Sequence, residues 1–186
     1  MNFEFNDRLK NNIINSIEQY HNQKLEAQFQ SLIFNELLSE NNGIPIVEYK
    51  KDEYRHDIFF NEKIYELKFQ YECDLTSIIN YYRDGTNKKI GSAIKNDIEI
   101  SDIFILFILK RSEEFKKHDN IVVKEAYNRY WNDSKRYNGN ETDDLIKEIE
   151  KDNKNNVEKS NKKNVKKIII NSPVKNKWVL DILIVS

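Results

Sequence analysis

The spacing of apolar residues predicts helices in the N-terminal part of the chain. Residues 6–22 and 23–40 have apolar positions three or four apart, which is typical of amphipathic helices, and 41–43 (NNG) indicates where the second one ends. In the second segment five apolar side chains fall on one helical arc: Leu25, Phe29, Leu32, Ile33 and Leu37. Glu26 and Glu36 fall on the same arc. Because a buried carboxylate needs a partner, each acid either lies at the boundary of the core or points into a polar site.

Apolar runs after the first glycine predict strands. Residues 46–50 (IVEYK) form a short strand candidate, and 54–60 (YRHDIFF) and 64–72 (IYELKFQYE) read as a β-hairpin. Residues 88–100 suit a helix, and 101–110 are apolar without alternation, which is typical of a strand covered on both faces. The predicted order is therefore helix, three strands, helix, strand.

The rest of the chain predicts two further helices and two late strands. Their ranges are 122–137, 143–151, 166–171 and 178–186. The pattern of the second helix is weak. These elements predict an α/β fold with a central mixed β-sheet flanked by helices. The 186 residues fit one domain, with a core at about 23–110 and an extension of helices and two strands at about 121–186.

Composition excludes several classes of function. Cys73 is the single cysteine, so neither an internal disulfide nor a cysteine-based zinc cluster can form. No apolar run approaches the ~18 residues of a membrane span. The four glycines are isolated, which argues against a glycine-rich phosphate loop. We therefore expect a soluble, cytoplasmic protein without membrane contact.

Charge is distributed unevenly along the chain, although the formal total is only -1. Residues 1–60 carry more acidic than basic side chains, and residues 121–186 carry more basic ones. Eight lysines lie between Lys154 and Lys177, opposed only by Glu158. This stretch either follows a phosphate backbone or is a solvated connector, so it permits a nucleic-acid partner without requiring one.

Three residues of the predicted hairpin point to a chemical site. Side chains alternate faces along a strand, so Glu66 and Lys68 project from one face, opposite the apolar face that contains Leu67. The hairpin returns the chain beside itself, which brings Asp57 close to Glu66. Two neighbouring carboxylates repel each other unless a cation lies between them, and Mg²⁺ binds one or two carboxylates together with water and phosphate oxygens. A lysine beside that ion can orient or deprotonate water, as phosphodiester hydrolysis requires.

This arrangement resembles the PD-(D/E)XK superfamily, the restriction-endonuclease-like nucleases. Asp57, followed by Glu66 and Lys68 on the adjacent strand after an N-terminal helix, matches the family's motif, and the order of elements matches over about residues 23–110. The resemblance implies the family's αβββαβ core. The chain departs from the pattern at His56, where the family commonly has proline.

The resemblance also implies roles for individual residues. Asp57 and Glu66 become ligands of Mg²⁺, for which Mn²⁺ would substitute, and Lys68 assists the attacking water. Glu26 becomes the helix acid that completes the site, with Glu36 as the competing choice. Three lysines of the following predicted helix would contact substrate phosphates: Lys88, Lys89 and Lys95.

Alternative interpretations of the charged residues stay open. Glu66 and Lys68 also suit an exposed sheet face, since opposite charges are common there. Glu114 and Lys116, with Asp102 upstream, match the same pattern, but their surroundings are polar and typical of a loop.

Histidines and aromatic residues give weaker signals. His21, His56 and His118 are too scattered for a zinc site. His56 either contacts substrate or caps the strand edge, and His118 suits a turn. The aromatic and basic side chains of 122–137 suit core packing or stacking on bases.

The sequence therefore predicts a Mg²⁺-dependent endonuclease that hydrolyses DNA, of restriction type or a subunit of such an enzyme. Cutting both strands requires two sites or two encounters, which is consistent with a homodimer or a partner subunit. The alternative is a nuclease-fold module that binds nucleic acid or protein without cutting. A ribonuclease would differ in substrate only.

Overall fold

The computed structural model describes residues 5–20, 25–40, 43–51, 53–71, 79–81, 88–90, 92–111, 141–155, 164–173 and 178–186. The helices are α1 (Asp7–Tyr20), α2 (Glu26–Ser39), α4 (Ser92–Ile100) and α7 (Glu141–Asn155). The strands are β1 (Ile46–Lys51), β2 (Tyr54–Phe60), β3 (Lys63–Tyr71), β4 (Ile79–Tyr81), β5 (Lys88–Ile90), β6 (Ile103–Arg111), β7 (Val165–Asn171) and β8 (Trp178–Val185). Within these segments no helix combines the length and the apolar character needed to cross a bilayer.

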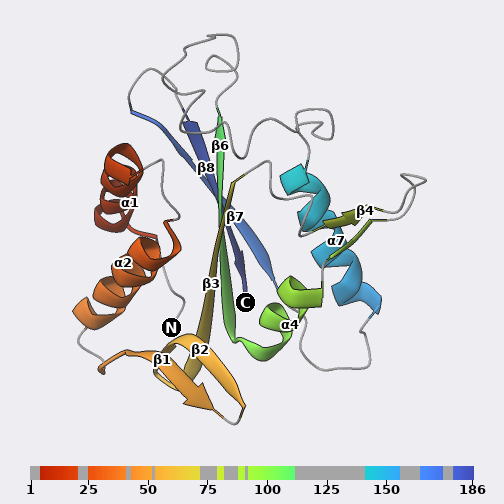
Figure 1. Cartoon of the computed structure of the whole chain (residues 1–186), viewed down its shortest axis with the longest axis horizontal. Helices are drawn as coiled ribbons and strands as arrows, with labels where there is room; N and C mark the ends of the chain where they lie inside the picture. Colours follow the sequence, from red (N-terminus) through yellow and green to blue (C-terminus); the bar gives the residue numbers. More distant parts are fainter. Residues whose placement is uncertain are drawn as a thin grey trace.

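A mixed six-stranded sheet forms the centre of the molecule (Figure 1), and the predicted α/β class is confirmed. Its strand order is β1-β2-β3-β6-β8-β7. Only the β3–β6 pair is parallel, and the other neighbours are antiparallel. The two late strands pair beside β6, so they extend the same sheet. The elements α2, β1, β2, β3, α4 and β6 follow one another in the predicted sequence, but β4 and β5, which form a separate two-stranded sheet, lie between β3 and α4.

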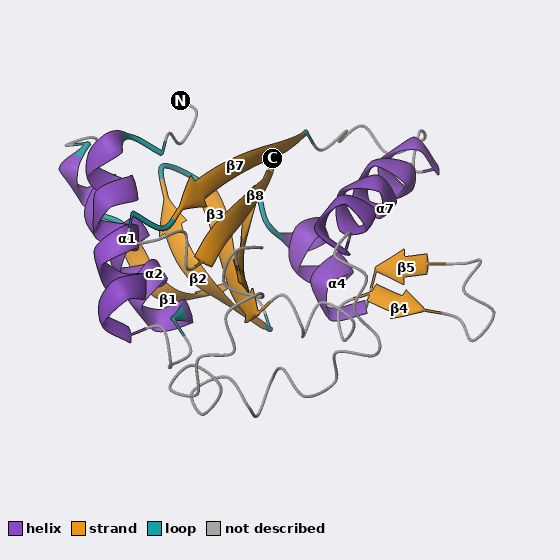
Figure 2. Ribbon diagram, turned by 90° about the horizontal axis from the view of Figure 1, so that it is seen from above, coloured by secondary structure: helices purple, strands orange, loops and turns teal. Residues whose placement is uncertain are grey.

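Helices cover both faces of the sheet (Figure 2). Helices α1 and α2 lie on one face, and α4 and α7 lie on the other. The first face holds the larger apolar core, where Phe29 of α2 packs on Phe69 of β3 and Phe107 of β6, with ring centroids 5.7 and 4.5 Å apart. A smaller core lies under α4 and α7 and includes Leu106 and Leu183. Strand β6 is therefore buried on both faces, as its unbroken apolar run predicts.

One predicted helix begins later than expected. Residues 88–100 suit a helix by spacing, but α4 starts at Ser92, and Lys88–Ile90 instead form β5, which pairs antiparallel with Ile79–Tyr81. A three-residue strand is stabilised by its partner rather than by its own periodicity, so local spacing could not reveal it. Lys88 and Lys89 therefore belong to a strand, and the predicted helix start is wrong.

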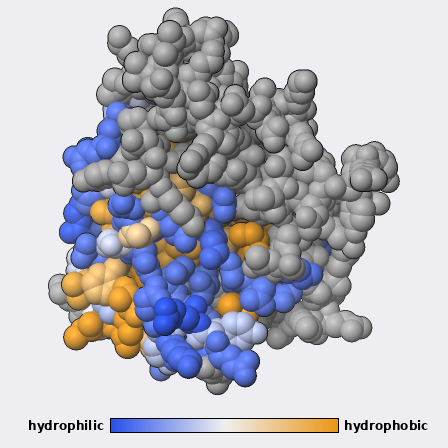
Figure 3. Space-filling model, in the orientation of Figure 1, coloured by the Kyte–Doolittle hydropathy of each residue, from blue (hydrophilic) through white to orange (hydrophobic). Residues whose placement is uncertain are grey.

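Strand β1 is an outer strand of the sheet and carries exposed apolar side chains. Ile46 and Val47 are about half exposed, and Ile44 just before them is 79% exposed. Figure 3 shows this apolar region at the lower left. Glu48 adopts a positive φ of 53° and has no partner in the β1–β2 register. Such an irregularity, together with charged residues on an edge strand, disfavours pairing with another sheet.

The core assignment predicts a contrast between two neighbouring leucines of α2. Leu37 is 1% exposed, whereas Leu38 is 41% exposed. Leu37→Ala should lower the free energy of unfolding by ~2–5 kcal/mol, because it leaves a cavity between α2 and the sheet. Leu38→Ala, the matched control, should change it by less than about 0.5 kcal/mol. Urea denaturation measures both, and equal losses would contradict the assignment.

Candidate active site

The candidate site lies where strand β2 leaves strand β3. Their ladder has its last register pair at Ile58 and Tyr65, so the amides further along β3 lack a strand partner on that side. The carboxylate of Asp57 takes one of them: its Oδ2 accepts a hydrogen bond from the Leu67 amide at 2.7 Å. Asp57 is therefore held at the opening between the two strands, as the hairpin prediction requires.

Helix α2 supplies two more polar side chains to this opening. Oε2 of Glu26 accepts a hydrogen bond from the Phe69 amide at 3.2 Å, the next amide on the same side of β3. Gln30, one helical turn after Glu26, donates from Nε2 to the main-chain oxygen of Asp57 at 3.0 Å. Since both contacts reach across from the helix, they fix the position of α2 relative to β2 and β3.

Glu66 is buried on β3 and contacts His56 of β2. Its Oε1 lies 2.6 Å from Nδ1 of His56, and both side chains are at most 6% exposed. The charge of Asp57, the residue after His56 on β2, also acts on the Glu66 carboxyl group. The interpretation of Glu66 as part of an exposed sheet face is therefore wrong. His56 does not cap an exposed strand edge, because its side chain is buried.

Lys68 projects from the same face of β3 as Glu66 and contacts helix α4. Its Nζ lies 3.6 Å from Oδ2 of Asp97, and the two side chains are 33% and 17% exposed. The charges of Glu26, Asp57, Glu66 and Asp97 all act on the lysine. The structure thus brings together Asp57, Glu66, Lys68 and Glu26, which the sequence singles out, and adds Asp97.

Burial raises the pKa of three acids of this site, Asp57, Glu66 and Asp97. The pKa of Glu66 rises from 4.5 to about 8. Burial is the largest cause, the charges of Asp57 and Asp97 contribute to the rise, and Lys68 opposes it. Burial also raises the pKa of Asp57, although the Leu67 amide and Lys68 oppose it. The pKa of Asp97 is raised by burial in spite of its contact with Lys68.

The pKa values of the two basic side chains of the site, Lys68 and His56, are shifted in opposite directions. Burial lowers the pKa of Lys68, but the surrounding carboxylates outweigh it and the net shift is upward, so the lysine stays protonated at neutral pH. The pKa of His56 is lowered, first by burial and then by the charge of Lys51. A neutral His56 has one N–H group, and Nδ1 donates it when Glu66 is ionised.

The donors present suit a hard divalent cation. Asp57 and Glu66 are two neighbouring carboxyl groups whose charges raise the cost of ionising both, and a cation bound between them would remove the repulsion and that cost. In the described part of the chain no group of three or more His, Cys, Asp or Glu side chains is arranged to hold a metal ion. The site therefore offers two protein carboxylates, and the remaining ligands would be water and substrate oxygens.

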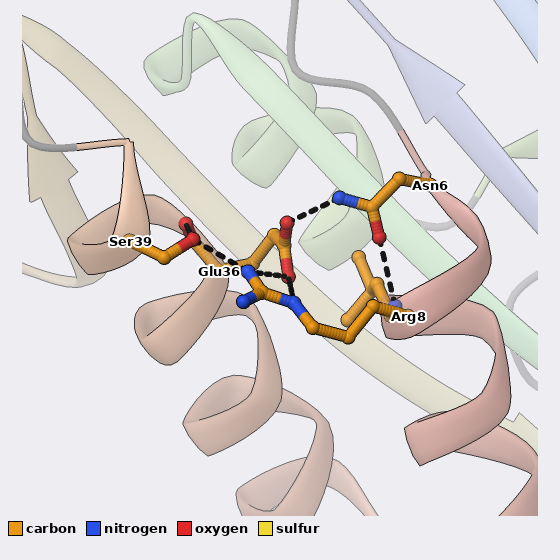
Figure 4. Close-up of polar contacts among 5 residues, drawn as sticks. Asn6, Arg8, Glu36 and Ser39 are labelled. Carbon is orange, nitrogen blue, oxygen red and sulfur yellow. Dashed lines mark hydrogen bonds and ion pairs between the residues drawn. The ribbon is translucent and has the colours of Figure 1, made fainter.

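Glu36, the competing choice for the helix acid, lies in a different environment (Figure 4). Its carboxylate accepts hydrogen bonds from Arg8, with Nη2 at 2.8 Å and Nε at 3.2 Å, and from the side chain of Asn6. Arg8 also contacts Ser39. Glu36 thus joins α1 to α2, whereas Glu26 faces β3.

The other residues singled out from the sequence lie outside the described part of the chain or elsewhere in the fold. The side chains of Lys88 and Lys89 lie outside the described residues, as do His21, Glu114, Lys116, His118 and the segment 122–137. Lys95 lies on α4 and is partly buried. Asp102 binds the start of β3, since its Oδ2 accepts a hydrogen bond from the Ile64 amide at 2.8 Å.

A second charged cluster lies on the same face of the sheet. Asp181 of β8 is 2% exposed and pairs with Lys110 of β6 and with Lys167 of β7, the latter at 3.3 Å. Lys167 also pairs with Asp143 of α7 at 3.1 Å. Lys167 is three strands from Lys68, about 14 Å away at the usual strand spacing. Because its charges compensate each other, this cluster ties α7 to the sheet and leaves Lys167 engaged with two carboxylates.

Gln30 and Asp97 are the site residues that the sequence did not single out. Both carried a weak signal. Gln30 follows Glu26 by four positions, so the two share one helix face. Asp97 lies beside the buried Ile98 and one turn from the buried Ile94, which indicates a position near the inward face of α4.

Comparison of the chain with protein-family models, with curated proteins and with solved structures finds no match.

The raised pKa of Glu66 predicts how stability depends on pH. Its pKa is about 8 in the folded chain and 4.5 ordinarily, so between these values the folded state binds more protons than the unfolded state. The free energy of unfolding should therefore fall as pH rises from 4.5 to about 8. Glu66→Gln removes this titration, so its stability should fall less steeply over that range. Urea denaturation at several pH values tests this, and identical slopes would refute it.

The different surroundings of Glu26 and Glu36 predict different consequences of the same substitution. Glu36→Gln should lower the free energy of unfolding by about 1–3 kcal/mol, because it weakens charge-assisted bonds to Arg8 and Asn6. It should leave Mn²⁺ affinity unchanged. Glu26→Gln should weaken Mn²⁺ binding by roughly 10-fold, because it disturbs the opening that holds Asp57. Calorimetric titration measures the Mn²⁺ affinity of both variants, and urea denaturation measures their free energy of unfolding. A loss of Mn²⁺ affinity in the Glu36 variant would reverse the assignment.

Proposed function

We propose that the chain is a Mg²⁺-dependent endonuclease of the PD-(D/E)XK type that hydrolyses DNA phosphodiester bonds. The observation that carries this proposal is the position of Asp57 and Glu66 at the opening between β2 and β3, where the charges of both carboxyl groups act on each other and on Lys68. Two acids and a lysine on the adjacent strands β2 and β3 are the residue types that metal-assisted phosphoryl transfer uses. The order of the surrounding elements supports the same family.

The charge of the site supports a cation as cofactor. Four acids, Glu26, Asp57, Glu66 and Asp97, act on a single lysine. A phosphate would be repelled once these acids are ionised, so substrate binding requires added positive charge. When bound by Asp57 and Glu66, Mg²⁺ supplies that charge, lowers the pKa of water and stabilises the charge that develops at phosphorus. Mn²⁺ has similar ligand preferences and should substitute.

The neighbouring residues hold this arrangement in place. Gln30 fixes the main chain at Asp57, and the Leu67 amide orients the Asp57 carboxylate. Asp97 holds the Lys68 ammonium group on the side of α4. Because these contacts exist before substrate arrives, little reorganisation is needed during the reaction.

The ion pair of Lys68 with Asp97, together with the raised pKa of the lysine in the cation-free site, favours one of the two roles considered for a lysine here. A protonated amine cannot take a proton from water. It can donate hydrogen bonds that orient the attacking water or a phosphate oxygen. We therefore assign Lys68 to orientation and charge stabilisation, and the proton of the attacking water leaves to solvent or to substrate phosphate.

We extend the proposal to the setting of the reaction. DNA is the substrate proposed from the family resemblance, with Lys95 and the lysines of β5 as candidates for phosphate contacts. A single site cuts one strand, so a homodimer or partner subunit would be needed to cut both strands in one encounter. A cytoplasmic location is proposed because the single cysteine gives no reason to place the chain in an oxidising compartment.

A plasmid-nicking assay tests the function. Supercoiled DNA incubated with the protein and Mg²⁺ should be converted to nicked or linear forms, and EDTA should prevent this. Asp57→Asn, Glu66→Gln and Lys68→Ala should each reduce the rate at least ~100-fold, because each removes a group that binds the cation or stabilises developing charge.

Matched controls separate the site from general charge effects. Glu62→Gln changes an exposed acid in the turn of the same hairpin, and Lys147→Ala changes an exposed lysine on α7. Both should retain wild-type nicking. Equal activity of wild type and site variants would exclude catalysis here. An inactive wild type that still binds DNA would favour a binding module, and cleavage of RNA alone would make the protein a ribonuclease.

A further inference from the structure

The contact between His56 and Glu66 has no role in the mechanism above. Nδ1 of His56 lies 2.6 Å from Oε1 of Glu66, and the exposed fractions of the two side chains are 3% and 6%. His56 precedes Asp57 on β2, so the residue that contacts the Glu66 carboxyl group is next to the acid whose charge acts on it. A buried imidazole in this position restricts the rotation of the carboxyl group much more than water would.

We propose that His56 is a positioning residue that restricts Glu66 to one oxygen for cation binding and thereby favours small divalent cations. This inference rests on the proposed metal site. The Nδ1 hydrogen of His56 is donated to Oε1, which turns that oxygen toward the imidazole. Oε2 is then the oxygen presented to a cation that Asp57 also binds.

One-oxygen binding has a consequence for the choice of ion. Mg²⁺ and Mn²⁺ prefer compact octahedral sites, in which each carboxylate supplies a single oxygen. Ca²⁺ is larger and takes more oxygen ligands, often both oxygens of one carboxylate. The hydrogen bond from His56 uses one lone pair of Oε1 and fixes the orientation of the carboxylate, so this contact disfavours binding of one cation through both oxygens and thereby disfavours Ca²⁺. Removing the contact should weaken binding of the small ions and reduce the discrimination between ions.

Two substitutions separate the hydrogen bond from the bulk of the side chain. His56→Leu keeps a buried side chain of similar size and removes the donor. His56→Asn places an amide N–H close to the position of Nδ1 and keeps the donor. The binding of Mn²⁺ and of Ca²⁺ to wild type and both variants is measured by isothermal titration calorimetry without DNA, with thermal unfolding as a check of folding.

The proposal predicts a specific pattern in these titrations. His56→Leu should bind Mn²⁺ ~10–100-fold more weakly than wild type, with a smaller ratio of Mn²⁺ to Ca²⁺ affinity. His56→Asn should recover most of the Mn²⁺ affinity and of the ratio. If folded His56→Leu retains both, the positioning role is refuted while the metal site stands. If wild type binds neither ion, the proposed function fails and this inference fails with it.

A measurement on the wild-type chain covers the case in which His56→Leu does not fold. The chain has three histidines, so nitrogen-15 labelling of histidine gives few signals, and His56→Asn identifies that of His56. In the chain saturated with Mg²⁺, His56 should show the signal of an Nδ1–H proton that is hydrogen-bonded and exchanges slowly. Absence of this proton from the Mg²⁺-saturated chain, or the other tautomer there, would overturn the proposal.

Discussion

The candidate site depends on the departure of β2 from β3 beyond the pair of Ile58 and Tyr65. Backbone amides that lose a strand partner must be satisfied by other groups when they are buried. Here the carboxylates of Asp57 and Glu26 accept from the amides of Leu67 and Phe69. The same geometry that opens the sheet thus fixes two acids beside Glu66 and Lys68, so structure and chemistry at this point have a common cause.

The rest of the fold can be understood as support for that opening. Strand β3 is held on its other side by β6, whose residues 103–109 are buried, and this pairing runs from Tyr65 to Tyr71, so β3 does not follow β2 away. Helix α2 packs its apolar side chains on the sheet and contributes Glu26 and Gln30, while Glu36 binds α1. Helix α4 covers the opposite face and contributes Asp97. Each side chain of the site therefore comes from an element anchored by an apolar core.

Much of this arrangement was predictable from local pattern. The alternation of faces in β3 predicts that Glu66 and Lys68 share a face, and the hairpin predicts that Asp57 lies near Glu66. The apolar arc of α2 predicts its buried side, and Leu25, Phe29, Ile33 and Leu37 are buried as expected. These predictions succeed because they depend on the backbone periodicity and on contacts between neighbouring strands.

The features that the sequence could not decide depend on contacts between distant segments. Glu26 and Glu36 lie on the same arc, and what separates them is Arg8, a residue of another helix. Asp97 approaches Lys68 only because α4 crosses the sheet at that level, and the pairing of Lys88–Ile90 with Ile79–Tyr81 replaces a helical turn. Periodicity carries no information about such contacts.

The most direct test of the central claim is a crystal soaked in Mn²⁺ and examined by anomalous diffraction. The account predicts a peak bound by both Asp57 and Glu66. Saturated crystals with no peak at this pair, or with ordered Mn²⁺ only elsewhere, would contradict it.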